Sequence, residues 1–327
     1  MRDEPRPVPP RLDDRDDTAG AVSRSLGRAA HEAAGLGLVG APENDAHPDL
    51  EVRRVHFDWS GVDVSWLPDD RVAGQVINVI HTALPVGERW FVATYRDALP
   101  LVHDEPLRTE MKAFMGQEAV HARSHAGFVA HMADQGYEPE PLEADVEARV
   151  AFWEGLGNRF LGERRTLRVR VAVIAGIEHY TAVLGEWALR TDVFDRGDPA
   201  VADILRWHGA EELEHKCVAF DVHQAVNGGS YALRALGYLV ASIELARYWD
   251  RSTAHLVAHD PHLRGIRGWR LRAAMARSAR RKNLPSRDLA KAFGAYLRPG
   301  FHPAERPTLG LSRTYLAESP AVRRLAS

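Results

Sequence analysis

Apolar residues recur at intervals of three and four positions in long blocks from about residue 71 onward, which is the pattern of amphipathic helices. No stretch of the chain alternates apolar and polar residues in the way that a half-buried strand does. We therefore predict an all-helical fold. The blocks predict helices over residues 71–101, 104–136, 143–191, 198–229 and about 230–257.

Residues that favour helix ends mark several of these boundaries. Asp104 suits the N-cap of the second helix, and Asp198 followed by Pro199 suits the start of the fourth. Gly136 and the Asn-Gly-Gly run at 227–229 are typical helix stops. These residues predict sharp ends for the second and fourth helices.

Two blocks contain residues that disturb a helix. Pro85 lies within the first block, so either the helix kinks there or a new helix starts with Pro85 in its first turn. Three glycines between residues 155 and 162 weaken the third block. We expect a break in that region.

The composition describes a globular chain with little preference for charged partners. Its 327 residues, 45% of them hydrophobic, suffice for one large domain or two small ones. The formal net charge of −3 gives no electrostatic reason to expect nucleic acid as a partner. Cys217 is the single cysteine, which excludes an intramolecular disulfide framework and fits a reducing compartment, so we expect a cytoplasmic protein.

The two ends of the chain differ from its middle. The first fifty residues carry mixed charge and proline but no apolar run that could form the core of a signal peptide. We expect a mostly disordered tail over residues 1–50, a helical domain over 51–305 and a C-terminal tail over 306–327.

Two segments raise the question of membrane contact. Residues 231–246 are apolar on most faces, but they fall short of the ~20 residues that span a bilayer and include Arg234 and Glu244, so we expect a buried helix. Residues 263–291 are rich in Arg and Lys. We interpret them as a solvated helix face, with weak contact of the protein with an anionic membrane surface as the alternative.

Two Glu-x-x-His pairs stand on separate predicted helices. Glu118 and His121 lie three residues apart, and so do Glu212 and His215. On a helix this spacing places both side chains on one face, within reach of a single ion. The chain contains no other Glu-x-x-His, which makes a chance origin of both pairs hard to sustain.

A bundle that holds two metals through such pairs needs one further glutamate from each of two other helices. Glu88 and Glu178 lie in the first and third helical blocks and supply them. Glu178 stands among Val, Ile and Leu residues, where a lone ionised carboxylate costs several kcal/mol. Pairing with Arg168 or Arg170, or protonation, could compensate; two divalent ions would neutralise all four carboxylates.

Other histidines and acids share the predicted ligand faces. His208 lies four residues before Glu212 and is a candidate third imidazole ligand, with a core histidine as the alternative. His125 lies four residues after His121, where it could orient a ligand by a hydrogen bond. Glu211 is placed to do the same, or to replace Glu212 as the ligand.

Several longer motifs carry a resemblance to known proteins. Over about residues 52–305 the chain resembles a bacterial family of predicted metal-dependent hydrolases, through PVGERWF, GQEAVHARSH, AGIEHYTA, WHGAEELEHKCVAFDV and YLRPGFHP. The ligand order is similar to that of ferritin-like di-iron N-oxygenases that oxidise arylamines, whose His-x-x-x-Glu-x-x-His helix is matched by His208, Glu212 and His215. The resemblance implies a ferritin-like four-helix bundle with additional C-terminal helices, in which Glu88 and Glu178 are terminal or bridging carboxylates.

The donor set suits iron or manganese, and the leading hypothesis is an oxygenase or oxidase in which two iron ions activate O2 for attack on a small organic substrate. Its partners would be that substrate, O2 and an electron donor, and a homodimer is compatible with the sequence. One alternative is a two-metal hydrolase, which would work with zinc or manganese. Another is a non-enzymatic ferritin-like protein that binds metal.

Overall fold

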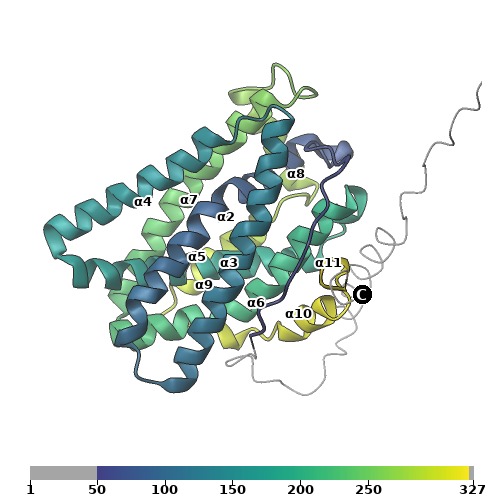
Figure 1. The fold of residues 1–327 in the computed structure, drawn as a ribbon. Helices are drawn as coiled ribbons and strands as arrows, with labels where there is room; N and C mark the ends of the chain where they lie inside the picture. The colour runs from purple at the N-terminus through teal and green to yellow at the C-terminus, as the bar shows by residue number, and fades with distance from the viewer. Residues whose placement is uncertain (1–49, 324–327) are drawn as a thin grey trace, which may run out of the picture.

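The computed structural model describes residues 50–323, so the expected N-terminal tail lies outside the described residues apart from Leu50. Within this range the chain forms helices and no strand, and the prediction of an all-α fold is confirmed. Figure 1 shows the arrangement. The helices are η1 (Pro68–Asp70), α2 (Arg71–Ala98), η2 (Leu99–Leu101), α3 (Glu105–Asp134), α4 (Glu140–Leu161), α5 (Glu163–Arg190), η3 (Val193–Arg196), α6 (Pro199–Asn227), α7 (Tyr231–His259), α8 (Trp269–Arg280), α9 (Ser286–Tyr296), η4 (Pro303–Glu305), α10 (Leu309–Leu316) and α11 (Pro320–Arg323).

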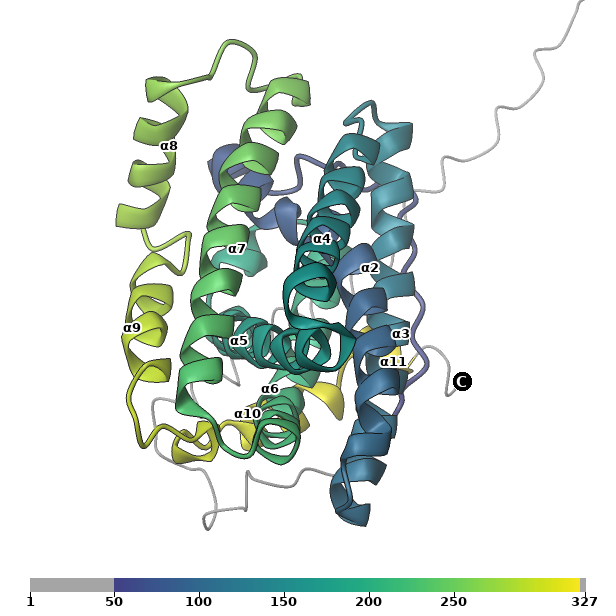
Figure 2. The ribbon, with the colours of Figure 1, turned by 90° about the vertical axis from the view of Figure 1, so that its left-hand side faces the viewer.

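Four helices surround the centre of the molecule. α2 contacts α3 and α5, and α6 contacts the same two helices, so that α2, α3, α6 and α5 form a closed ring. α4 and α7 lie side by side on the face that Figure 2 turns toward the viewer, with α8 and α9 at one edge of that face. α6 is buried on nearly every side because α10 also packs against it. The classification of this arrangement as ferritin-like remains a prediction.

The predicted helix ends agree closely with the structure. The Asp104 carboxylate accepts a hydrogen bond from the backbone N–H of Leu107 (2.8 Å), and Asp198 accepts one from Ala200 (2.9 Å). Gly228 ends α6 with a φ of 60°, a left-handed conformation that glycine adopts without steric cost. The local capping chemistry therefore fixes where α3 begins and where α6 begins and ends.

The two expected disturbances have different outcomes. α2 runs through Pro85 without a break, so the alternative that a new helix starts there is wrong. The break expected between residues 155 and 162 is confirmed: α4 ends at Leu161, and Gly162 has a φ of 78° before α5 begins.

Two expectations about the second half of the chain need correction. One face of α7 is not buried, because Leu236 and Ile243 are 50% and 66% exposed. Residues 306–323 are not a plain tail, because they form α10 and α11, and Leu309 and Tyr315 are buried against the body. No helix within residues 50–323 has both the length and the apolar character that crossing a membrane requires.

Glycines let α5 and α6 approach closely. A Cβ atom at Gly185 of α5 would lie 2.3 Å from the backbone oxygen of Gly209 in α6, a distance that forces the helices apart. We expect Gly185→Ala to lower the free energy of unfolding by about 2 kcal/mol or more, measured by chemical denaturation. Gly155→Ala is the control: a Cβ there meets nothing within 4 Å, and we expect a gain of about 0.5–1 kcal/mol from helix propensity. Equal effects of the two changes would contradict this explanation of the packing.

Candidate metal centre

Each helix of the ring turns acidic or imidazole side chains into the same buried volume. The long apolar faces of α2, α3, α5 and α6 bring these residues inside as the helices pack, because the polar groups share a helical face with core residues. Every one of them is at most 3% exposed. They are Glu88 from α2, Glu118, His121 and His125 from α3, Glu178 from α5, and His208, Glu211, Glu212 and His215 from α6.

Glu212 lies at the centre of the cluster. Its Oε1 atom is 3.6 Å from Nδ1 of His121 and 3.6 Å from Nδ1 of His215. The same His215 nitrogen lies 2.9 Å from Oε1 of Glu118 and 3.7 Å from Oε2 of Glu178. The structure thus brings both Glu-x-x-His pairs and Glu178 together.

Glu88 and His208 lie beside this group. Nε2 of His208 is 2.7 Å from Oε1 of Glu212 and 3.7 Å from Oε1 of Glu88. Donor atoms of Glu88, His121 and His208 come within 4.8 Å of one another, as do those of Glu118, His121, Glu212 and His215. Because the two groups share His121, they adjoin, and each could hold a cation.

Polar side chains contact the Nε2 atoms of His121 and His215. Nε2 of His121 lies 2.8 Å from a carboxylate oxygen of Glu211, and Nε2 of His215 lies 2.9 Å from the amide oxygen of Gln117. Hydrogen bonds of this kind keep the proton on Nε2 and leave Nδ1 free to bind a cation. Glu211 therefore lies behind His121, whereas Glu212 lies between the imidazoles.

An outer layer that we did not predict supports these contacts. Arg53, in the segment before α2, binds Glu211 at 2.9 Å and Glu214 at 3.1 Å. The Gln117 amide nitrogen donates to Glu214 as well (2.9 Å). Although burial lowers the pKa of Arg53, the two glutamates raise it further and keep the guanidinium charged. Arg53 precedes Glu211 by 158 residues, so sequence spacing gives no signal for the pair.

The acids of the cluster are held in unequal protonation states. Burial, and then the neighbouring glutamates, raise the pKa of Glu88 and of Glu178 well above the ordinary value. Burial acts in the same direction on Glu212, but His208 and His215 outweigh it and lower its pKa well below the ordinary value. Like charges held this close need protons or cations to compensate them.

The unsatisfied atoms of the cluster fit divalent cations. Within residues 50–323, no contact has the geometry of a hydrogen bond to either carboxylate oxygen of Glu88, Glu118 or Glu178, or to Nδ1 of His121 or His215, although Nδ1 of His215 and Oε1 of Glu118 approach to 2.9 Å. A buried polar atom left without a partner costs free energy, and carboxylates with imidazoles suit divalent transition metals. The alternative in which Arg170 neutralises Glu178 is wrong, because Arg170 binds Thr94, Asp97 and Glu154 instead, and Arg168 is exposed.

A chain of three histidines extends from the cluster into the core. Nδ1 of His208 lies 2.6 Å from Nε2 of His125, whose Nδ1 lies 2.7 Å from Nδ1 of His81. We did not predict a role for His81 from the sequence, although it precedes Glu88 by seven residues and therefore shares its helical face. Burial, followed by repulsion from His208, lowers the pKa of His81 to about 3.

This depressed pKa predicts acid sensitivity. Between about pH 6.5 and pH 3, His81 is protonated in the unfolded chain but not in the folded protein. The free energy of unfolding therefore falls as the pH falls through this window. In metal-free protein we expect His81→Phe to reduce the slope of unfolding free energy against pH by about 1.4 kcal/mol per unit between pH 6 and 4. Denaturation at several pH values measures the slope. An unchanged slope would contradict the prediction, and the exposed His103→Phe serves as the control.

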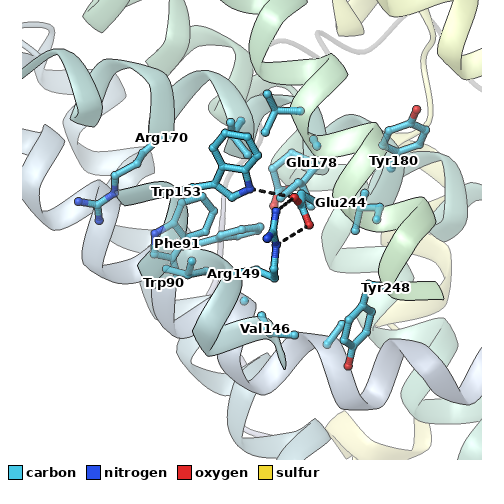
Figure 3. Close-up of a pocket in the computed structure, with 18 of the residues that line it drawn as sticks. Trp90, Phe91, Val146, Arg149, Trp153, Arg170, Glu178, Tyr180, Glu244 and Tyr248 are labelled. Carbon is cyan, nitrogen blue, oxygen red and sulfur yellow. Dashed lines mark hydrogen bonds and ion pairs between the residues drawn. The ribbon is translucent and has the colours of Figure 1, made fainter. Parts of the chain in front are cut away.

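A cavity of about 530 Å³ reaches the cluster from the outside. Glu88, Glu118, Glu178 and Glu212 form part of its wall, and the rest comes from α2, α4, α5 and α7. Figure 3 shows Glu178 near this space, together with aromatic side chains of α2 and α4. A small molecule in the cavity would therefore lie against the acids.

Comparison with known proteins gives one match. Residues 51–306 match a protein family described as predicted metal-dependent hydrolase. No curated protein matches the chain significantly, and no solved structure does.

Proposed function

Since the chain belongs to the family of predicted metal-dependent hydrolases, we propose that the buried cluster binds two divalent metal ions and hydrolyses a small-molecule substrate in the adjoining cavity. The observation that carries this proposal is the set of buried oxygens and nitrogens that converge without hydrogen-bond partners among the described residues. The family description also fits hydrolysis better than the oxygenase that we placed first on the sequence alone.

The chain offers donors for both ions. Glu118, His121, Glu212 and His215 would hold one, and Glu88 and His208 would contribute to the second, with Glu178 next to His215. Four carboxylates bring about four negative charges, which two divalent ions neutralise. A neutral cluster removes the cost of burying these acids together.

When bound, the two ions would lower the pKa of a coordinated water toward neutrality and polarise the bond to be cleaved. The protein's own contribution is placement. Glu211, supported by Arg53, fixes the ring of His121, and Gln117 fixes that of His215. Contacts of this kind typically raise metal affinity or activity 10- to 100-fold. Burial keeps bulk water away from the donors.

An anaerobic assay tests the proposal. We expect protein loaded with zinc or manganese under argon to hydrolyse p-nitrophenyl esters or phosphate diesters, and a chelator to abolish the activity. Glu178→Gln, which keeps the shape but not the charge, should lose it as well. A lack of hydrolysis with every metal and substrate class would count against the proposal.

A second candidate is an oxygen-activating di-iron enzyme. The two Glu-x-x-His pairs, together with Glu88 from α2 and Glu178 from α5, favour it, because such donor sets in helical bundles suit iron or manganese. Iron would supply the oxygen chemistry, and an electron donor would be required. Loading with ferrous iron under argon, followed by air, should then produce oxygen uptake and a visible absorption band. Uptake of oxygen without anaerobic hydrolysis would favour this candidate over the first.

A further inference from the structure

The wall of the cavity identifies the kind of substrate that it can accept. We infer that the substrate of the metal centre carries a long apolar chain, which enters between α4 and α7, and that Gly87 keeps room for its reacting end beside the acids. The reaction rests on the proposed function, whereas the binding of the chain does not.

The middle of the cavity is apolar. Between the acids and the surface its wall is formed by aliphatic side chains of four helices, and few polar groups interrupt it; examples are Leu84, Val150, Val173, Ile177, Val240 and Leu245. Pockets that bind small molecules combine apolar walls with a few polar groups that fix orientation. Here the carboxylates without hydrogen-bond partners are gathered at the inner end, whereas the other charged groups of the wall pair with one another, so the reacting group belongs at the inner end and the apolar part outside it.

The apolar wall continues to the surface. Phe160 and Leu161 of α4 and Leu236 of α7 line the cavity and are 70%, 46% and 50% exposed. An exposed apolar patch that is continuous with a cavity marks a binding site more often than a bare surface does. The patch continues the apolar wall to the surface of the molecule, which gives an apolar chain a path to the acids.

A bridge of side chains crosses the opening. Glu244 of α7 accepts hydrogen bonds from the indole N–H of Trp153 (2.8 Å) and from Nε of Arg149 (3.1 Å), both on α4. Figure 3 shows these contacts, and Arg247 binds Glu244 from the same helix at 3.0 Å. Because these charges satisfy one another, the opening does not need a charged group from the substrate. The bridge instead ties α4 to α7 beside the cavity.

Gly87 provides space at the inner end. It lines the cavity next to Glu88, and a Cβ atom there would meet nothing within 4 Å. Glycine inside a helix costs about 1 kcal/mol relative to alanine, so its presence at this position of α2 has no local structural reason. A bulky side chain at residue 87 would occupy the space beside the carboxylates.

Displacement of a neutral apolar dye tests the inference without requiring activity. The dye N-phenyl-1-naphthylamine should fluoresce on binding the metal-loaded protein, and butan-1-ol, hexan-1-ol, octan-1-ol and decan-1-ol should displace it. We expect each added methylene to tighten binding by about fourfold until the cavity is filled. Affinity that does not depend on chain length would overturn the inference.

Variants locate the binding. We expect Gly87→Phe to weaken octan-1-ol binding at least tenfold, whereas Gly155→Phe, at an exposed glycine of α4 outside the cavity, should bind like the parent protein. Val240→Trp, which narrows the same cavity from α7, keeps the test valid if Gly87→Phe does not fold. Unchanged binding in both cavity variants would overturn the inference. Metal content, measured on the same samples, reports separately on the proposed function.

Discussion

Glu212→Gln should reduce the metal content of the protein from two ions per chain to one or none and lower its activity at least a hundredfold. Oε1 of Glu212 lies 3.6 Å from Nδ1 of His121 and of His215 and 2.7 Å from Nε2 of His208. Glu212 therefore contacts the donors proposed for each of the two ions. Glutamine preserves the volume and an acceptor oxygen but removes the charge. Metal analysis by mass spectrometry after dialysis measures the effect.

Glu211→Gln is the matched control on the neighbouring residue. Its carboxylate contacts His121 and Arg53 from behind and does not face the other acids. We expect its metal affinity to fall by 10- to 100-fold, with both ions retained when metal is in excess. If Glu211→Gln loses the ions and Glu212→Gln keeps them, the assignment of the two residues is wrong.

Glu178→Leu should stabilise the metal-free protein relative to the parent, and this advantage should shrink by about 2.7 kcal/mol when metal is added. In the metal-free protein the substitution removes a buried acid that has no hydrogen-bond partner among the described residues, and we expect a gain of about 1–4 kcal/mol. With metal at a hundred times its dissociation constant, the parent protein gains about 2.7 kcal/mol that the variant lacks. Chemical denaturation with excess metal and with chelator measures both values.

Glu186→Leu provides the comparison on the same helix. Glu186 is also buried on α5, but it pairs with Arg190 at 3.0 Å and with Arg306 at 2.9 Å. We expect Glu186→Leu to change the free energy of unfolding by the same amount with and without metal. If Glu178→Leu behaves in the same way, Glu178 does not contribute to a metal centre.

Local chemistry explains why much of the fold and the cluster could be predicted from the sequence. Apolar spacing, Asp caps and glycine stops are properties of short segments, and they located α3 and α6 to within a few residues. The Glu-x-x-His spacing is local as well, because a helix places residues three apart on one face. The grouping of Glu88 and Glu178 with these pairs followed from the rule that a two-metal bundle takes one further glutamate from each of two other helices, and for Glu178 also from the cost of an isolated buried acid.

The remaining features depend on contacts between distant segments. Arg53 reaches Glu211 across 158 positions, and Gln117 gains its role only because α3 packs beside α6. The apolar residues of α7 suggested full burial, but Leu236 and Ile243 are exposed, and Leu236 lines the cavity. Average apolar character does not distinguish a core face from the mouth of an apolar site.

Anomalous X-ray diffraction from crystals grown with manganese would locate the metal ions themselves. We expect two peaks per chain, both among the carboxylates of Glu88, Glu118, Glu178 and Glu212 and the Nδ1 atoms of His121 and His215. Crystals that take up manganese elsewhere, or that show only water between these side chains, would contradict the proposed metal centre.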